Sequence, residues 1–122
     1  MLKNPLIIYE QALKIDREIG DRRGEGIQLG YLGSAYRDLG ETEKAIGYYE
    51  QAFELNPEDG NICYNKACAD SLMNKKSEAF AQLKRAIELN PRYRELAKSD
   101  KDFEKLWEEK DFKDIVTVNK ED

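Results

Sequence analysis

The sequence predicts an all-α fold made of antiparallel helical hairpins that stack on one another. Similar segments recur 34 residues apart, because Glu54-Leu55-Asn56-Pro57 returns as Glu88-Leu89-Asn90-Pro91 and Ala45 returns as Ala79. In addition, β-branched residues are few, whereas Ala, Glu, Lys and Leu are abundant. A period of this length is typical of helical hairpins, which bury their apolar faces by stacking on their neighbours.

The repeat, together with the Pro, Gly and Asn residues that interrupt helices, predicts six helices. We expect them at residues 5–19, 25–39, 42–55, 58–73, 76–89 and 91–98. Three Asn-Pro pairs, Asn4-Pro5, Asn56-Pro57 and Asn90-Pro91, are interpreted as helix starts. Asn is a good N-cap and Pro is favoured at the first helical position. Gly40 and Asn74 mark the turns within the hairpins, and the glycine-rich stretch Gly20–Gly26 is interpreted as a loop.

The tail after residue 93 departs from the repeat. Ser99-x-x-Asp102 fits a capping box at the start of a short helix. The segment that follows carries large apolar residues among charged ones, and we expect them to close the open end of the core. These residues are Phe103, Leu106, Trp107, Phe112, Ile115 and Val116. Residues 117–122 are expected to fray.

The first helix carries apolar residues over a wide arc, namely Leu6, Ile7, Ile8, Ala12, Leu13, Ile15 and Ile19. Two interpretations remain open. Either the helix at 25–39 covers the arc, or part of the arc is free and mediates self-association.

Residues 26–59 resemble a tetratricopeptide repeat. Leu29, Leu32-Gly33 and Tyr36 match the pattern of the first helix in that family, and the second helix matches at Ala45, Tyr49, Ala52 and Pro57. Gly33 and Ala45 are expected to face each other, because small residues let two helices approach closely.

Residues 60–93 resemble the repeat more loosely. Ala67 stands at the Gly position, and Ala79, Leu83, Ala86 and Pro91 are in place, but Lys66 replaces the Leu and Asp70 replaces the Tyr. Tyr9-Glu10-Gln11-Ala12 returns as Tyr49-Glu50-Gln51-Ala52 at an offset of 40, so the first helix resembles a second helix without its partner. The resemblance implies a short right-handed α-solenoid. It divides into a half-repeat at 1–25, repeats at 26–59 and 60–93, and closing helices at 94–116.

The resemblance also implies a non-catalytic module that binds a peptide or a partner protein in a concave groove lined by the first helix of each repeat. The positions carried over are Tyr31, Ser34, Arg37, Asp38, Asn61, Tyr64, Asn65, Cys68 and Lys98. Tyr31, Tyr64, Asn65 and Arg37 are the chief contact candidates, with burial between hairpins as the alternative for the two tyrosines.

Some family members use such a groove to clamp a C-terminal carboxylate with Lys, Asn and Arg side chains. Here Asn65 and Lys98 match that arrangement, but Gly30, Ser34 and Asp102 stand at the other places. We therefore do not predict that specificity.

Composition argues against several other functions. The net charge is −5 with no cluster of basic residues, which disfavours nucleic acid and anionic membranes. No apolar run approaches the roughly 20 residues of a membrane span, so we expect a cytoplasmic protein. The chain lacks histidine, a phosphate-binding loop and a Gly-x-Ser-x-Gly motif, so we expect neither an enzyme nor a cofactor.

The two cysteines, Cys63 and Cys68, are expected to be reduced, since on one helix they point to different faces. Without histidine or a second cysteine pair, no metal site is expected. Two further possibilities for the whole chain stay open, a self-associating structural module joined through the helix at 5–19, and a regulatory part of a larger enzyme or signalling assembly.

Overall fold

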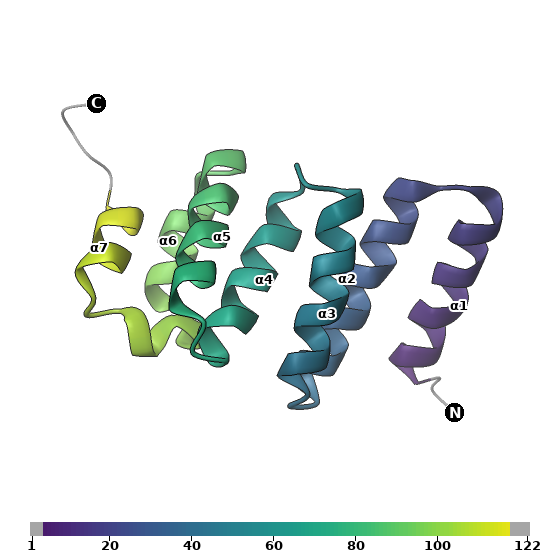
Figure 1. Cartoon of the computed structure of the whole chain (residues 1–122), viewed down its shortest axis with the longest axis horizontal. Coiled ribbons are helices and arrows are strands. Elements are labelled where there is room, and N and C mark those ends of the chain that lie inside the picture. The colour runs from purple at the N-terminus through teal and green to yellow at the C-terminus, as the bar shows by residue number, and fades with distance from the viewer. Residues whose placement is uncertain (1–3, 118–122) are drawn as a thin grey trace.

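The computed structural model describes residues 4–117, which form a row of helices with the two ends of the chain at opposite ends of the row (Figure 1). The helices are α1 (Pro5–Ile19), α2 (Arg22–Asp38), α3 (Thr42–Leu55), α4 (Gly60–Leu72), α5 (Lys76–Leu89), α6 (Arg92–Ser99), the 3-10 helix η1 (Lys101–Leu106) and α7 (Lys110–Val116). No strand occurs within residues 4–117. Consecutive helices pack against one another, so the predicted all-α solenoid is confirmed.

The ends of α1, α3 and α5 fall where the sequence predicts them. At the start of α1, Oδ1 of Asn4 accepts a hydrogen bond of 2.9 Å from the Leu6 amide, which confirms the Asn4-Pro5 cap. The expected loop at Gly20–Gly26 is shorter than predicted. Asp21 accepts a hydrogen bond of 2.9 Å from the Gly24 amide, and this cap starts α2 at Arg22 rather than at residue 25.

The interpretation of Asn56-Pro57 as a helix start is wrong. The Asn56 amide donates to the Ala52 carbonyl and so ends α3, and α4 starts three residues after Pro57 at Gly60. Its cap is Asp59, whose Oδ1 accepts from the amides of Asn61 (2.9 Å) and Ile62 (3.3 Å). A side-chain carboxylate within bonding reach of two free amides decides the start.

The other predicted helix starts and turns lie at or within one residue of the expected positions. Asn90 accepts from the Arg92 amide at 3.1 Å, and α6 begins one residue after Pro91. Gly40 (φ 85°) and Asn74 (φ 60°) take left-handed conformations in the turns after α2 and α4.

The core consists of two apolar clusters that meet at α4. Residues of α1, α2 and α3 form the first cluster together with Ile62 and Ala69 of α4, and Cys63, Tyr64, Ala67 and Cys68 on α4 belong to the second, with α5 and the tail. Inside the first repeat, the ring of Tyr49, rather than Ala45, lies nearest to Gly33.

The tail closes the second cluster, as predicted. Phe103, Leu106, Phe112 and Val116 are buried, and the indole Nε1–H of Trp107 donates to the Ala97 carbonyl at 3.3 Å. The prediction that Ser99 caps this helix is wrong by one residue. Asp100 caps η1, because its side chain accepts a hydrogen bond of 3.0 Å from the Asp102 amide. Of the tail expected to fray, only Thr117 lies within the described residues.

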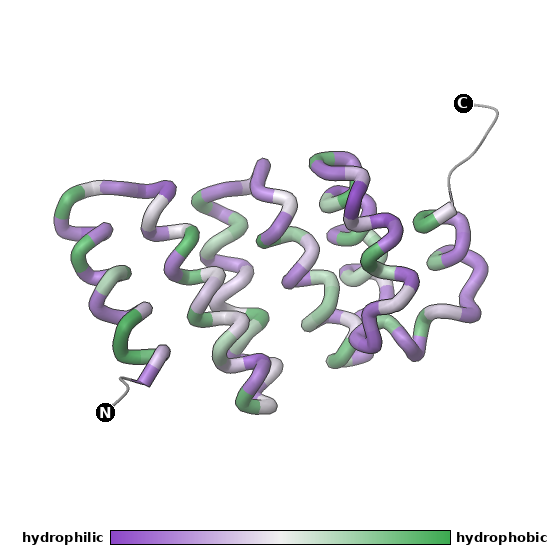
Figure 2. The backbone as a smooth tube through the Cα atoms, turned by 180° about the vertical axis from the view of Figure 1, so that it is seen from behind, coloured by the Kyte–Doolittle hydropathy of each residue, from purple (hydrophilic) through white to green (hydrophobic). Residues whose placement is uncertain are grey.

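Helix α2 covers only part of the apolar arc on α1. Leu13 is buried and Leu6 and Tyr9 pack against the first cluster, but Ile15 remains 55% exposed and Ile19 69%. Exposed apolar residues therefore remain on α1, the helix at one end of the row, whose hydrophobic positions are green in Figure 2. No helix in the described part of the chain is long and apolar enough to cross a membrane.

Candidate functional site

The predicted binding positions on α2 are accessible to different degrees. Tyr31 is 47% exposed, and the side chain of Asp38 is 77% exposed. Ser34 is half-buried, and its hydroxyl lies 2.8 Å from the Tyr49 hydroxyl. The Arg37 side chain is 22% exposed and extends toward Asp102 of η1, with 3.5 Å between Nη1 and Oδ2. Arg37 therefore also connects the first repeat to the tail.

The predicted positions on α4 are largely covered, and this corrects two of the expected contact residues. Tyr64 is 4% exposed and Cys68 1% exposed. The Tyr64 hydroxyl donates to Oδ2 of Asp100 at 2.7 Å, and its ring stacks on Tyr93 with 4.7 Å between centroids. Neither Tyr64 nor Cys68 presents a surface to a partner, and burial between packed helices, the alternative left open for Tyr64, is what the structure shows.

The covering element is η1, which lies against α4. The Ser71 hydroxyl donates to the Asp102 carbonyl at 2.7 Å, and the Cys68 thiol lies 3.8 Å from Asp100 Oδ2. Two predicted positions remain accessible on α4, Asn61, which is exposed, and Asn65, which is half-buried. Lys98 is exposed on α6, where its ammonium group pairs with Glu95 at 3.0 Å.

Cys68, Asp100 and Asp102 bring their potential ligand atoms within 4.8 Å of one another. Asp100 accepts hydrogen bonds from the Tyr64 hydroxyl and from the Cys68 thiol, and Arg37 faces Asp102. Burial, together with the neighbouring Asp100, raises the pKa of Asp102, and burial also raises the pKa of the Cys68 thiol. Bonds within the protein therefore account for this cluster, and we assign it a structural role in holding η1 on α4.

A pocket of about 410 Å³ opens between the start of α1 and the end of α2. Apolar and aromatic side chains make up most of its wall, namely Pro5, Leu6, Tyr9, Tyr31, Ala35 and Leu39. The polar members are Asn4, Ser34 and Asp38. The rings of Tyr9 and Tyr31 lie 5.2 Å apart at an angle of 35°.

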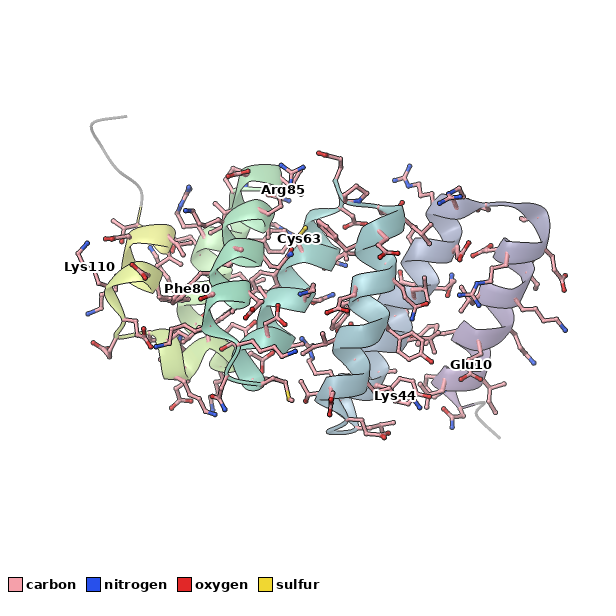
Figure 3. The ribbon with its side chains drawn as sticks, in the orientation of Figure 1. Glu10, Lys44, Cys63, Phe80, Arg85 and Lys110 are labelled. Carbon is pink, nitrogen blue, oxygen red and sulfur yellow. The ribbon has the colours of Figure 1, made fainter. Side chains whose placement is uncertain are left out.

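Two of the larger hollows have a different character. One of about 640 Å³ lies between α1 and α3 and is lined by the charged residues Glu10, Lys14, Arg17 and Glu18, among others. The other, of about 630 Å³, lies at the loops before α4 and α6, where polar residues such as Arg23, Asn56, Glu58 and Asp59 surround it. Figure 3 shows that Glu10 extends from the α1 side, whereas Cys63 lies between α4 and α5. Several charged side chains line both hollows, although Leu13, Leu32 and Tyr48 also line the first.

Comparison with known protein families identifies the repeat. Two family models, each described as a tetratricopeptide repeat, match residues 27–59 and 60–93. Together the two matches cover more than half of the 122 residues. The chain is a tetratricopeptide-repeat protein. A search of curated proteins found no match.

Tetratricopeptide repeats are generally modules of protein–protein interaction, and the family is generally non-catalytic. The two matched units correspond to α2 with α3 and to α4 with α5. In this tetratricopeptide-repeat protein η1 lies on the second unit, which leaves the first helix of the first unit as the more accessible one.

Sequence reasoning missed the contribution of α1 to this site. Tyr9 and Leu6 help to form the pocket with Tyr31, whereas the sequence pattern predicts for this helix a half-repeat or a surface for self-association. The signal available was the Tyr9–Ala12 recurrence, which marks Tyr9 as the counterpart of the large inward-facing Tyr49. In the structure Tyr9 pairs with Tyr31 of α2.

Proposed function

We propose that this protein binds a short segment of a partner protein along α2 and the accessible part of α4, without catalysing a reaction. The observation that carries the proposal is the exposed ring of Tyr31 beside a pocket of about 410 Å³. An amphipathic aromatic side chain at the rim of an apolar pocket is a typical anchor of protein interfaces.

The remaining contacts follow from what η1 leaves uncovered. Asn61 and Asn65 of α4 can hydrogen-bond the backbone of an extended segment, and Ser34 is a polar member of the pocket wall. Asp100 and η1 cover Tyr64, Cys68 and Ser71, so the surface that remains accessible suits only a brief segment of a partner. A brief segment buries little area, which favours weak binding or participation in a larger assembly.

The test is affinity capture from cell extract with immobilised protein, followed by mass spectrometry. Tyr31→Ala and Asn65→Ala should each weaken recovery of a specific partner, with Tyr31→Ala reducing affinity roughly tenfold. Glu50→Ala and Lys84→Ala are controls, because both side chains are exposed on the second helices of the repeats. Equal recovery by all four variants would exclude this surface.

A second candidate function is self-association through α1. Ile8, Ile15 and Ile19 are exposed along one stripe of α1, together with the half-buried Ala12. At the other end of the row, buried Phe103 and Phe112 seal the core. Two identical copies that pair through α1 about a two-fold axis would cover this stripe on both copies.

Sedimentation equilibrium over a hundredfold range of concentration tests this candidate. A dimer that is lost in Ile8→Lys/Ile15→Lys would support it, and a monomer at the highest concentration would exclude it. Lys14→Glu, on the same helix, is the control for a simple change of surface charge.

A further inference from the structure

We propose that the pocket between α1 and α2 receives an arginine side chain of the partner, with the guanidinium group stacked on Tyr31 and paired with Asp38. This inference rests on the proposed binding function and specifies the chemistry that the pocket selects. It follows from the wall of the pocket, from the charge at its rim and from the geometry of the two tyrosines.

The wall suits a long side chain with an apolar stem. Leu6, Ala35 and Leu39 supply aliphatic surface, and Leu39 is 62% exposed at the rim. The methylene groups of arginine can lie along such a wall while the charged end stays at the opening. A volume of about 410 Å³ accommodates one such side chain with its neighbouring backbone.

The charge that the described residues place at the rim is negative. Asp38 is the single charged residue among the described residues that line the pocket. Its Oδ1 lies 4.0 Å from Nε of Arg37, at the outer limit of an ion pair, while Nη1 of Arg37 lies 3.5 Å from Asp102. The exposed Asp38 carboxylate can therefore accept hydrogen bonds from a ligand cation, and an acidic ligand would be repelled.

The tyrosines favour arginine over lysine. The Tyr9 and Tyr31 rings, with 5.2 Å between their centroids, line the same pocket as Asp38. A planar guanidinium group can stack on an aromatic face and at the same time donate two hydrogen bonds to one carboxylate, which a lysine ammonium group cannot do. Lysine should still bind, but less tightly.

Selection from a random nonapeptide display library tests the inference. Peptides selected by the unchanged protein should share an arginine. Asp38→Asn should weaken a selected peptide about five- to tenfold, as expected for the loss of a charge-assisted hydrogen bond. Replacing that arginine by citrulline, a neutral side chain of the same shape, should have an effect of similar size. Glu50→Gln, which neutralises an exposed carboxylate on α3, is the matched control and should leave the affinity unchanged.

Charge reversal gives the sharpest outcome. Selection with Asp38→Arg should enrich peptides that carry Asp or Glu in place of the shared arginine. Selected peptides without a common basic residue, or with an affinity indifferent to Asp38, would overturn the inference and leave the binding function standing. If no peptide is enriched above background, the binding function itself is contradicted, and the inference with it.

Discussion

The ammonium nitrogen of Lys66 lies 3.0 Å from Oδ2 of Asp70, one turn further along α4, and both side chains are buried. The equivalent positions in the first repeat hold Leu32 and Tyr36. Tyr36 stacks on Tyr48, whose counterpart in the second repeat is Gln82. A buried ion pair therefore stands in the second repeat where the first has an apolar layer. Within the described residues, Asp70 Oδ1 and Gln82 Oε1 are both buried without a hydrogen-bond partner.

We expect this pair to be less stabilising than the apolar residues it replaces. Burying two charges can cost more solvation free energy than their attraction returns, whereas packed apolar side chains carry no such cost, so Lys66→Leu/Asp70→Tyr should raise the free energy of unfolding by roughly 1–4 kcal/mol. Lys66→Leu alone should lower it by about 3–5 kcal/mol, because it leaves an unpaired buried carboxylate. Urea unfolding followed by circular dichroism measures both. A double variant less stable than the unchanged protein would show that the pair is net stabilising.

The same pair predicts a pH dependence. Burial raises the pKa of Asp70 despite the opposing effect of Lys66. The folded state then holds the proton more tightly than the unfolded state, whose Asp pKa is about 3.9. The free energy of unfolding of the unchanged protein should therefore fall relative to that of Lys66→Leu/Asp70→Tyr as the pH rises from about 4 through the pKa of folded Asp70. Unfolding curves for the two proteins at several pH values between about 3.5 and 7 check this sign, and a constant difference would contradict it.

Gly33 is expected to tolerate no side chain. A Cβ atom at this position would lie 2.7 Å from Cε1 of the buried Tyr49 ring. Gly33→Ala should therefore lower the free energy of unfolding by about 1–3 kcal/mol through overpacking. Gly47→Ala on α3 is the control, since a Cβ there meets no atom within 4 Å. It should raise stability by about 0.5–1 kcal/mol through helix propensity alone, and equal effects of the two changes would exclude the steric explanation.

Phe103 is expected to be essential to the closed end of the solenoid. Its side chain is fully buried and contacts the rings of Tyr64 and Phe112, with centroid distances of 5.7 and 5.8 Å. Phe103→Ala should cost about 3–5 kcal/mol. The same change at the half-buried Phe80 of α5, which Figure 3 labels, should cost less.

Native-state hydrogen exchange locates the effect of Phe103→Ala. Because the core has two clusters that meet at α4, amides of α5 and α6 should lose protection before those of α2 and α3. A uniform loss along the chain would indicate a single cooperative core instead.

Much of the fold could be predicted because its signals are local. The 34-residue recurrence fixed the order of the hairpins, and the turns at Gly40 and Asn74 marked where helices reverse. Errors arose where two candidate caps competed within a few residues. Asp59 rather than Asn56 starts α4, and Asp100 rather than Ser99 starts η1, because the carboxylate that reaches the free amides depends on the path of the whole loop.

The candidate site was less predictable than the fold. Tyr31 and Asp38 lie exposed on α2, as their helix positions suggest, but Tyr64 and Cys68 lie beneath η1. The pairing of Tyr9 with Tyr31 depends on how the consecutive helices α1 and α2 are rotated against each other. The burial of Tyr64 and Cys68 depends on contact with Asp100, 36 and 32 residues further along the chain.

The sequence by itself determined that this chain forms stacked helical hairpins, since the spacing of small and large residues and the turn residues act within one hairpin. The tertiary structure alone decided which groove positions remain accessible. The tail could in principle lie elsewhere, but burial of Phe103 and Phe112 against α4 and α5 removes large aromatic surfaces from water and holds η1 over Tyr64. Tertiary packing of α4 also buries Lys66 and Asp70, so that two residues that interrupt the repeat pattern form an ion pair inside the protein.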